Sequence, residues 1–158
     1  MVALDTFDLR LLAMIQRDAG LTNQEIGTRI ALSASQVSRR RARLESEGVI
    51  RRVRAELSRD ALGLQVTAFV GVTLNAHSRA NSRRFRDLVN GMASVQEAHA
   101  LTGEMDYLIK IAVADLKSLA QVINDDLLAH DSVQNVHSSI VLETIREDNQ
   151  LPLASGLS

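Results

Sequence analysis

The spacing of the apolar residues changes near residue 64 of this chain. Before that point apolar side chains recur at helical spacing, whereas from residue 66 to 74 every second residue is apolar, which is the period of a strand. The charge changes at almost the same place. Residues 1–60 hold 11 Arg against 8 Asp and Glu, a net charge of +3, and residues 61–158 hold 7 Lys and Arg against 11 acids, a net charge of −4. Both changes indicate two modules with different partners.

Residues 1–50 are predicted to form three short helices. Asp5 is suited to cap the first helix, which is expected to end at Ala19-Gly20, where glycine favours a stop. Capping boxes open the second and third helices; they are Thr22-x-x-Glu25 and Ser33-x-x-Gln36. Because the turn between these two helices, ALSA, is short, the pair is typical of a helix-turn-helix, whose second helix enters the DNA major groove. The next segment, GVIRRVRAELS, is expected to be a short extended hairpin or a linker.

The third helix carries consecutive arginines, which cannot share a face because an α-helix turns by about 100° per residue. If Val37 faces the core, Arg39 lies on the opposite side, and Arg40 and Arg43 lie along one flank. An arginine fork can bond a guanine edge, so Arg39 is predicted to read bases, and Arg40 and Arg43 to hold phosphates. The other DNA-binding candidates are polar residues of the same helix: Ser33, Ser35, Gln36 and Ser38. The alternative is a solvated helix that binds nothing.

Arg41 lies about 40° from Val37 and therefore near the buried side of the third helix. A buried guanidinium without a partner would be costly. Its stem is expected to extend outward, or its charge to pair with Asp8, Glu25 or Glu45. This arginine is therefore interpreted as structural.

Residues 64–148 are predicted to form a ferredoxin-like β-α-β-β-α-β domain, which makes the chain an α+β protein. Its helices would cover one face of an antiparallel sheet and leave the other face for a partner. The expected elements are strand 65–75, helix 79–91, strands 94–102 and 107–114, helix 116–129 and strand 133–143. The predicted division is a helix-turn-helix domain at 1–50, a linker or hairpin at 51–63, the ferredoxin-like domain at 64–148 and a flexible tail at 149–158.

The composition excludes several kinds of protein. The chain has no cysteine, so it has no disulfides and no thiolate metal sites or nucleophiles, which suits a reducing compartment. Its first residues do not resemble a signal peptide, and the uncharged run 61–78 is interrupted by polar residues and too short to span a membrane. We expect a cytoplasmic protein with no membrane segment, no metal and no cofactor.

Four segments of the chain are LDTFDLRLLAMIQRDAGLTNQEI, LSASQVSRRRARLESEGVI, LSRDALGL and LTGEMDYLIKI. In their order and spacing these segments together resemble the Lrp/AsnC (feast/famine) transcription regulators. The resemblance covers nearly the whole chain. It implies a winged or simple helix-turn-helix that binds double-stranded DNA, and a ferredoxin-like module that forms a homodimer through its sheet. It also implies assembly of dimers into octamers, with small effectors, often amino acids, bound between the dimers.

In that family the TGxxDY loop lies at the effector pocket, which here implies roles for Thr102, Gly103, Asp106 and Tyr107. The residues agree, since glycine permits a tight loop and a carboxylate accepts bonds from an ammonium group. Further candidates on the last strand are Ser138 and Ile140. The alternative is a hairpin whose aspartate caps its own turn.

Two other functions are compatible with the same scaffold. Sirohaem decarboxylases resemble this two-module architecture, but such an enzyme has no need of a basic recognition helix. In addition, the four histidines show neither metal-ligand nor catalytic-triad spacing; these histidines are His77, His99, His130 and His137. We therefore expect no enzymatic activity. The other possibility is an architectural DNA-binding protein without an effector.

Overall fold

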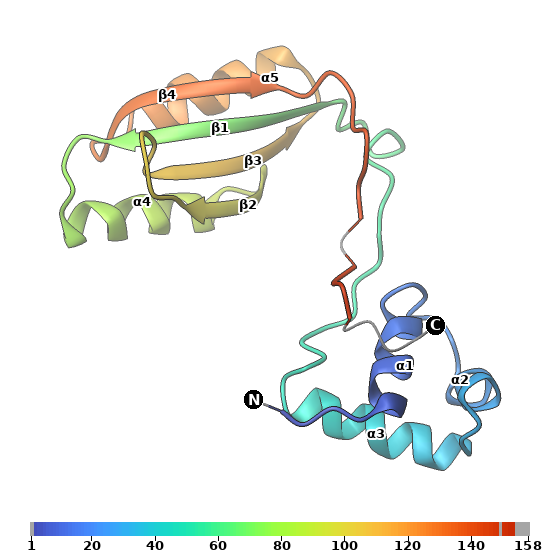
Figure 1. The fold of residues 1–158 in the computed structure, drawn as a ribbon. Coiled ribbons are helices and arrows are strands. Elements are labelled where there is room, and N and C mark those ends of the chain that lie inside the picture. Colours follow the sequence, from blue (N-terminus) through green and yellow to red (C-terminus); the bar gives the residue numbers. More distant parts are fainter. Residues whose placement is uncertain (1, 149, 154–158) are drawn as a thin grey trace. The chain divides into compact units, whose positions relative to one another are not determined.

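The computed structural model describes residues 2–148 and 150–153, which form two compact units (Figure 1). One unit contains the residues up to Glu56 together with the C-terminal segment from Arg146. The other unit is Leu57–Ile145, against a predicted domain of 64–148. Among the described residues no helix is long and apolar enough to cross a membrane.

The first unit is built from three helices, α1 (Thr6–Ile15), α2 (Asn23–Ile30) and α3 (Ala34–Ser46). Each of the three predicted N-caps is confirmed, and each is a complete capping box. The apolar stripes of the helices meet in one buried cluster; its members are Leu11, Leu12, Ile26, Ile30, Val37 and Leu44. The phase chosen for α3, with Val37 inward, is therefore correct.

The turn between α2 and α3 depends on two backbone features. Ala31, the C-cap of α2, has a left-handed conformation with φ 58°. A methyl group on Gly27 would overlap the carbonyl oxygen of Leu32, so only glycine lets the turn pass this close to α2. These features set the direction in which α3 leaves the turn.

One prediction for this unit is wrong, and one alternative is decided. Helix α1 ends at Ile15 instead of at Ala19-Gly20, because the Asp18 carboxylate accepts from the Gly20 N–H at 2.8 Å and forms a separate turn. Of the two alternatives for the segment after α3, a hairpin or a linker, the structure has the linker, since residues 51–57 contain no strand. Val53 is 56% exposed, so this segment has no apolar surface against which a hairpin could be buried.

The second unit has the predicted β-α-β-β-α-β order and is a four-stranded antiparallel sheet, β2-β3-β1-β4. Its elements are β1 (Val66–Leu74), α4 (Arg79–Gly91), β2 (Val95–Ala100), β3 (Tyr107–Val113), α5 (Leu116–Gln121), the π-helix η1 (Val122–Leu128) and β4 (Val133–Ile140). The single helix predicted at 116–129 is thus α5 continued by η1. Strand β4 ends at Ile140, before the predicted residue 143, because its pairing with β1 stops at Ala68.

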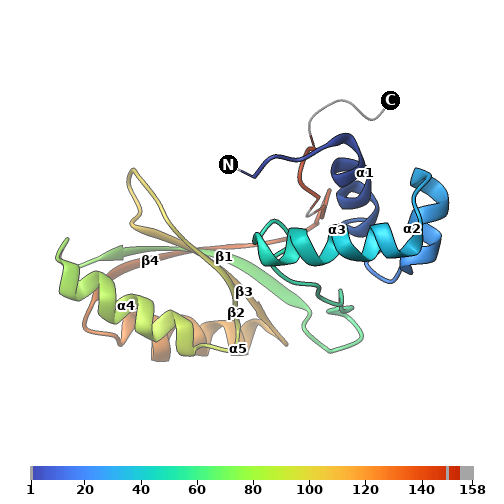
Figure 2. The same ribbon diagram turned by 90° about the horizontal axis from the view of Figure 1, so that it is seen from below.

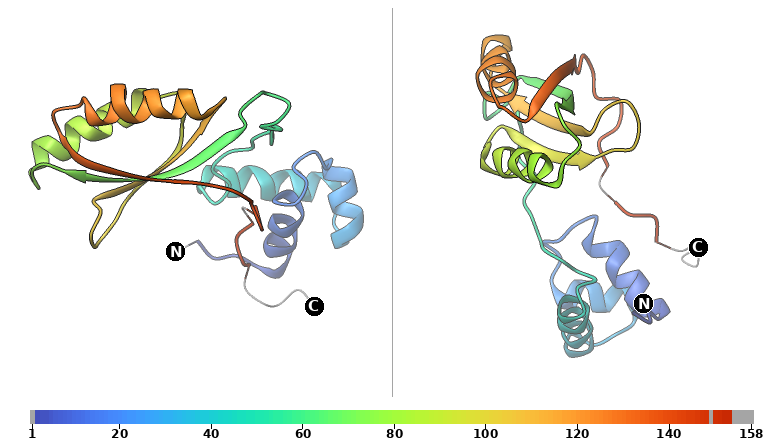
Figure 3. Two further views of the ribbon diagram at one scale, coloured as in Figure 1. Left: turned by 90° about the horizontal axis from the view of Figure 1, so that it is seen from above. Right: turned by 90° about the vertical axis from the view of Figure 1, so that its left-hand side faces the viewer.

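The two faces of the sheet differ in what covers them. Helices α4 and α5 lie on the same side, as Figures 2 and 3 show, and bury the side chains that point toward them. On the opposite face Phe69 is 40% exposed. Gly71 lies on this open face beneath Met105, and a methyl group at this glycine would overlap the Met105 sulfur. The prediction of one covered and one open face is therefore confirmed.

The chain returns to the first unit after β4. The side chain of Gln16 donates to the Leu151 carbonyl at 3.2 Å and accepts from the Leu151 N–H at 3.1 Å, and Leu153 packs on the helix cluster. Residues 150–153 therefore do not form the free tail that was predicted for 149–158. Residues 149 and 154–158 lie outside the described residues.

Candidate functional site

The exposed face of α3 is the first candidate site. Ser35 and Arg39 are exposed on the side opposite Val37, and Ser38 is exposed on the adjoining flank. Within residues 2–148 and 150–153 the Arg39 guanidinium forms no ion pair or hydrogen bond. Its donors are therefore available to a group outside the chain.

Two of the predicted DNA-binding residues form the N-terminal cap of α3. The Gln36 side chain accepts from the Ser33 N–H at 2.9 Å, and the Gln36 N–H donates to Ser33 Oγ at 3.2 Å. The hydroxyls of Ser33 and Ser35 lie 3.0 Å apart. These contacts fix the first turn of α3, whose amide groups suit a DNA phosphate.

Arg40 points away from the exposed face and contacts the start of α1. Its Nη1 lies 2.6 Å from an Asp5 oxygen and 2.7 Å from an Asp8 oxygen, and its guanidinium lies 5.4 Å from the Phe7 ring centre. Only 25% of the Arg40 side chain is exposed. The hydrogen bonds to Asp5 and Asp8, of which the one to Asp5 has the larger effect, raise the pKa of Arg40. The pKa of Asp5 is lowered, chiefly because its carboxylate accepts a hydrogen bond from the Asp8 N–H.

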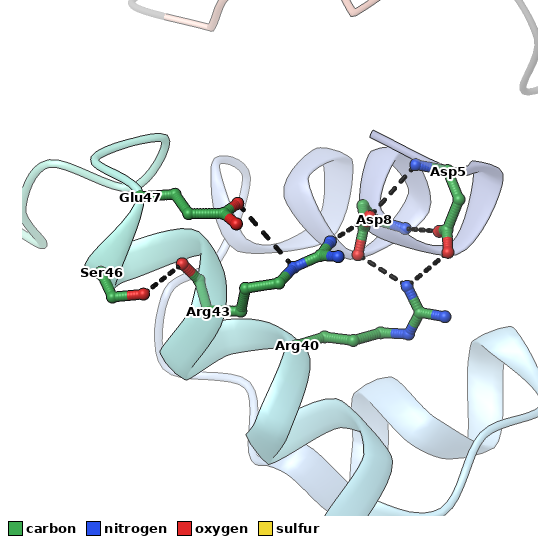
Figure 4. Close-up of polar contacts among 6 residues, drawn as sticks. All are labelled: Asp5, Asp8, Arg40, Arg43, Ser46 and Glu47. Atoms are coloured by element: carbon green, nitrogen blue, oxygen red, sulfur yellow. Dashed lines mark hydrogen bonds and ion pairs between the residues drawn. The ribbon is translucent and has the colours of Figure 1, made fainter. Parts of the chain in front are cut away.

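Arg43 also contacts α1, through the second oxygen of Asp8, and lies 3.9 Å from Glu47 (Figure 4). Asp8 is fully buried, so it needs both cations to compensate its charge. We call Asp5, Asp8, Arg40 and Arg43 the α1–α3 clamp. The flank assigned to phosphate contact therefore faces α1, which the helical phase alone could not reveal.

Arg41 has the structural surroundings that were predicted for it. Its Nε lies 3.5 Å from the Glu45 carboxylate one turn later, and 23% of its side chain is exposed. Among the three proposed partners, Glu45 is thus the one that it contacts.

The predicted effector loop also carries internal contacts. Thr102 and Gly103 are exposed, and Gly103 has a φ of 129°, which favours glycine. The Asp106 carboxylate, however, accepts from the Leu74 N–H at 2.8 Å and lies 3.2 Å from His77 Nδ1. Asp106 therefore joins this loop to the end of β1, close to the alternative in which it caps a turn.

Tyr107, the first residue of β3, is 7% exposed, and its ring centre lies 4.6 Å from that of Phe85 on α4. Asp106 and Tyr107, although adjacent, therefore have different internal contacts, one with the end of β1 and the other with α4. Tyr107 also lines a cavity of about 250 Å³ between α4 and β2.

Sequence reasoning missed two polar residues of this cavity, Arg86 and Asn90 on α4. Their spacing of four residues, next to the apolar pair Phe85 and Val89, is the pattern that could have indicated a shared face. The two candidates on β4 do not line it. Ser138 and Ile140 lie on the strand at the opposite edge of the sheet from β2.

The histidines are not gathered into a metal-binding or catalytic cluster. His77 pairs with Asp106, His99 lies 3.3 Å from Glu97, and His130 Nδ1 lies 3.3 Å from the Ser132 N–H. Across the described part of the chain, no group of three or more His, Cys, Asp or Glu side chains is placed to hold a metal ion.

Two family models match the two units. Residues 4–51 match a winged helix-turn-helix DNA-binding model, and residues 67–151 match the Lrp/AsnC ligand binding domain.

Relatives match along almost the whole chain. The chain is 32% identical to the leucine-responsive regulatory protein of Rhizobium meliloti over 96% of this chain and 97% of that protein. It is 30% identical to the transcriptional regulator AzlB of Bacillus subtilis, with the same shares covered. Among solved structures, a transcriptional regulator of Neisseria meningitidis in complex with L-methionine superimposes with a TM-score of 0.93 at 35% identity, covering 96% of this chain and 98% of that one.

Proposed function

The chain belongs to the Lrp/AsnC family of transcriptional regulators, and from this premise we propose that it reads specific DNA with the exposed face of α3 and responds to an amino acid. The observation that supports the DNA-binding role most strongly is that the arginines of α3 differ in whether they have acidic partners within the chain. Arg40, Arg41 and Arg43 each pair with an acid of the first unit, whereas Arg39 has no partner among the described residues. We assign base contact to Arg39, with Ser38 beside it.

The phosphate contacts are assigned to groups that border this face. The amide groups at the start of α3 and the Ser35 hydroxyl suit one phosphate. Arg43, whose side chain is 42% exposed, has donors left for a second phosphate beyond its bond to Asp8. Arg40 is assigned chiefly to the α1–α3 clamp.

The DNA assignment is tested on a site selected from random duplexes with the purified protein. Arg39→Ala is expected to lose about 1–3 kcal/mol on that site and to relax the preference at one base position, whereas its affinity for random DNA falls little. Arg10→Ala, which removes an exposed arginine of α1, is the matched control. Equal losses of Arg39→Ala on selected and random DNA would contradict base reading.

We further propose that the effector is an amino acid bound at the loop and strand ends that carry Thr102, Gly103, Asp106 and Tyr107. The L-methionine complex of the Neisseria regulator supports this class of ligand. Calorimetry with the twenty amino acids, followed by DNA titrations with any that bind, tests the proposal. If none binds, the protein is an effector-independent, architectural DNA-binding protein.

Asp106→Asn separates the two roles of that side chain, because an amide oxygen can still accept from the Leu74 N–H. If Asp106 binds the ammonium group, this variant is expected to lose the amino-acid response while DNA binding without ligand is kept. An unchanged response would assign Asp106 to the fold alone.

Assembly is proposed to use the open face of the sheet. That face exposes Phe69, and one helix-turn-helix covers only one half-site of a symmetric operator. A homodimer, and octamers built from it, would place several α3 helices along the DNA. Phe69→Lys is expected to lower the mass measured by light scattering, and a parent protein that is a monomer at micromolar concentration would contradict the proposal. As a DNA-binding protein it is assigned to the cytoplasm and no catalytic role is proposed.

A further inference from the structure

The outer side of α4, which faces away from the sheet in Figure 2, carries a line of arginines. Helix α4 holds four of the seven Lys and Arg residues of 61–158, a region whose net charge is −4, and only one acid. At about 100° per residue, three of these arginines fall within about 60° of one another, and an asparagine falls among them. We call Arg79, Arg83, Arg86 and Asn90 the α4 stripe; all four residues are exposed.

The arginines of the stripe are not paired within the part of the chain that the structure describes. None of the three forms a hydrogen bond or an ion pair there. Asp87 lies one turn after Arg83, yet the two side chains form no ion pair. Arg84, on another side of the helix, differs because it donates to Asn81. The guanidinium groups of the stripe therefore have donors for a group outside the chain.

The stripe does not help α4 to form. Arg79 is the first residue of the helix, where the helix dipole disfavours a cation, and the first turn contains no acid. Arg83 has like charges four residues before it and three residues after it, and like charges at such spacings destabilise a helix. A bound anion would relieve this repulsion. The pattern therefore favours a role in binding over a role in folding.

The dimensions and polarity of the stripe indicate an extended anion. From Arg79 to Arg86 the helix rises by about 10 Å, which is more than one carboxylate or one phosphate covers. The phosphates of a DNA strand recur about every 3.4 Å along the axis, so several lie within this length. Among the described residues, α4 supplies none of the large exposed apolar side chains, so the stripe lacks the apolar centre that is typical of protein interfaces.

We propose that the α4 stripe binds the phosphate backbone of DNA, as a contact additional to the helix-turn-helix. Guanidinium groups pair with phosphates, and the Asn90 amide can donate to a phosphate oxygen. Such contacts carry no base preference, so the stripe adds affinity for any duplex. The inference rests on the proposed function because it takes DNA as the partner, but it does not require that Arg39 reads bases.

The test measures DNA affinity as a function of salt for the full-length protein. The duplexes are roughly six helical turns, about 60 base pairs, with either the selected site or a random sequence. Arg79→Gln/Arg83→Gln should lower the affinity for both duplexes alike and keep the ratio between them. It should also reduce the slope of log affinity against log salt by about 2 per bound chain, because each phosphate contact contributes about 0.9. Addition of Arg86→Gln should reduce the slope by about 1 more.

Two further variants are the controls. Arg84→Gln/Lys117→Gln removes the same charge from the same unit outside the stripe and should keep the slope of the parent. Arg79→Lys/Arg83→Lys keeps the charge and should keep most of the slope, because the slope depends on the number of phosphates neutralised. Circular dichroism and light scattering should give the same helix content and mass for all variants as for the parent.

The contrary results are distinct from one another. If the parent binds DNA and Arg79→Gln/Arg83→Gln keeps its slope, the stripe does not contact phosphates and the DNA-binding role of α3 stands. An equal loss of slope in Arg84→Gln/Lys117→Gln would show a general charge effect and overturn the proposal. A changed mass in the stripe variant would assign the stripe to contacts between copies of the chain, which also overturns it. If the parent binds neither duplex, this inference and the proposed function are both wrong.

Discussion

The α1–α3 clamp and the α4–β2 cavity are both groups of polar side chains gathered around arginines, but they differ in whether the chain satisfies them. In the clamp, Asp8 is fully buried and both of its oxygens contact arginines of α3. In the cavity, the Arg86 guanidinium and the Tyr107 hydroxyl form no hydrogen bond or ion pair among the described residues. A satisfied cluster stabilises the fold, whereas an unsatisfied one retains its capacity to bind something else.

The same distinction applies within a single helix. Arg39 and Arg40 are neighbours in the sequence, yet among the described residues Arg39 has no partner and Arg40 has two acidic ones. Basic composition alone therefore does not select candidates for DNA contact. The proposal selects Arg39 because it is exposed and has no partner within the part of the chain that the structure describes.

The largest expected effect comes from breaking the clamp at its buried member. Asp8→Asn removes the charge that two arginines contact and should destabilise the helix-turn-helix unit by about 3 kcal/mol. Urea unfolding followed by circular dichroism measures the change. Glu47→Gln is the matched control, because its contact with Arg43 is long and exposed and should be worth less than about 0.5 kcal/mol.

Acid should weaken the clamp in a defined pH range. Because the pKa of Asp5 is lowered in the folded state, its carboxylate stabilises the fold above the unfolded pKa, and this contribution is lost as the pH falls through the lower, folded value. The contribution of Asp5 to the stability of the helix-turn-helix unit should therefore be constant between about pH 5 and 7 and should decline below about pH 4. Asp5→Asn should remove part of that decline; an unchanged pH profile would argue against the role of Asp5.

The smallest expected effect belongs to Arg41. Its contact with Glu45, an ion pair one turn apart between a half-buried and an exposed side chain, is worth about 0.3–0.5 kcal/mol. Arg41→Ala should therefore change the unfolding free energy by less than about 1 kcal/mol and leave DNA affinity unchanged. A loss of DNA affinity as large as that of Arg39→Ala would show that Arg41 contacts DNA.

Local patterns predicted most of the fold. The capping boxes at Thr22 and Ser33 depend on residues three positions apart, so the sequence alone contains them. The alternation of β1 likewise fixed which of its residues are buried. The end of β4 could not be predicted in this way, because it depends on how far β4 stays paired with β1, which lies about 70 residues earlier in the chain.

The candidate sites were harder to predict than the fold. The helical phase placed Arg40 on the correct flank, but the partner that occupies this flank, Asp8, is 32 residues away in the sequence. Asp106 and Tyr107 were grouped by their motif, although Asp106 contacts the end of β1 and Tyr107 contacts Phe85 on α4. Arg86 was missed as a residue of the α4–β2 cavity because that cavity depends on β2 packing beside α4, which is a tertiary contact.

The most direct test of the distinction between satisfied and free arginines measures two quantities for two variants, Arg39→Ala and Arg40→Ala. Affinity for the selected DNA site and the free energy of unfolding are determined for both under the same conditions. We predict that Arg39→Ala loses about 1–3 kcal/mol of specific binding and less than about 0.5 kcal/mol of stability. Arg40→Ala should instead lose about 1.5–3 kcal/mol of stability, with the smaller change in DNA affinity. If Arg40→Ala keeps its stability and loses as much specific binding as Arg39→Ala, the account is contradicted.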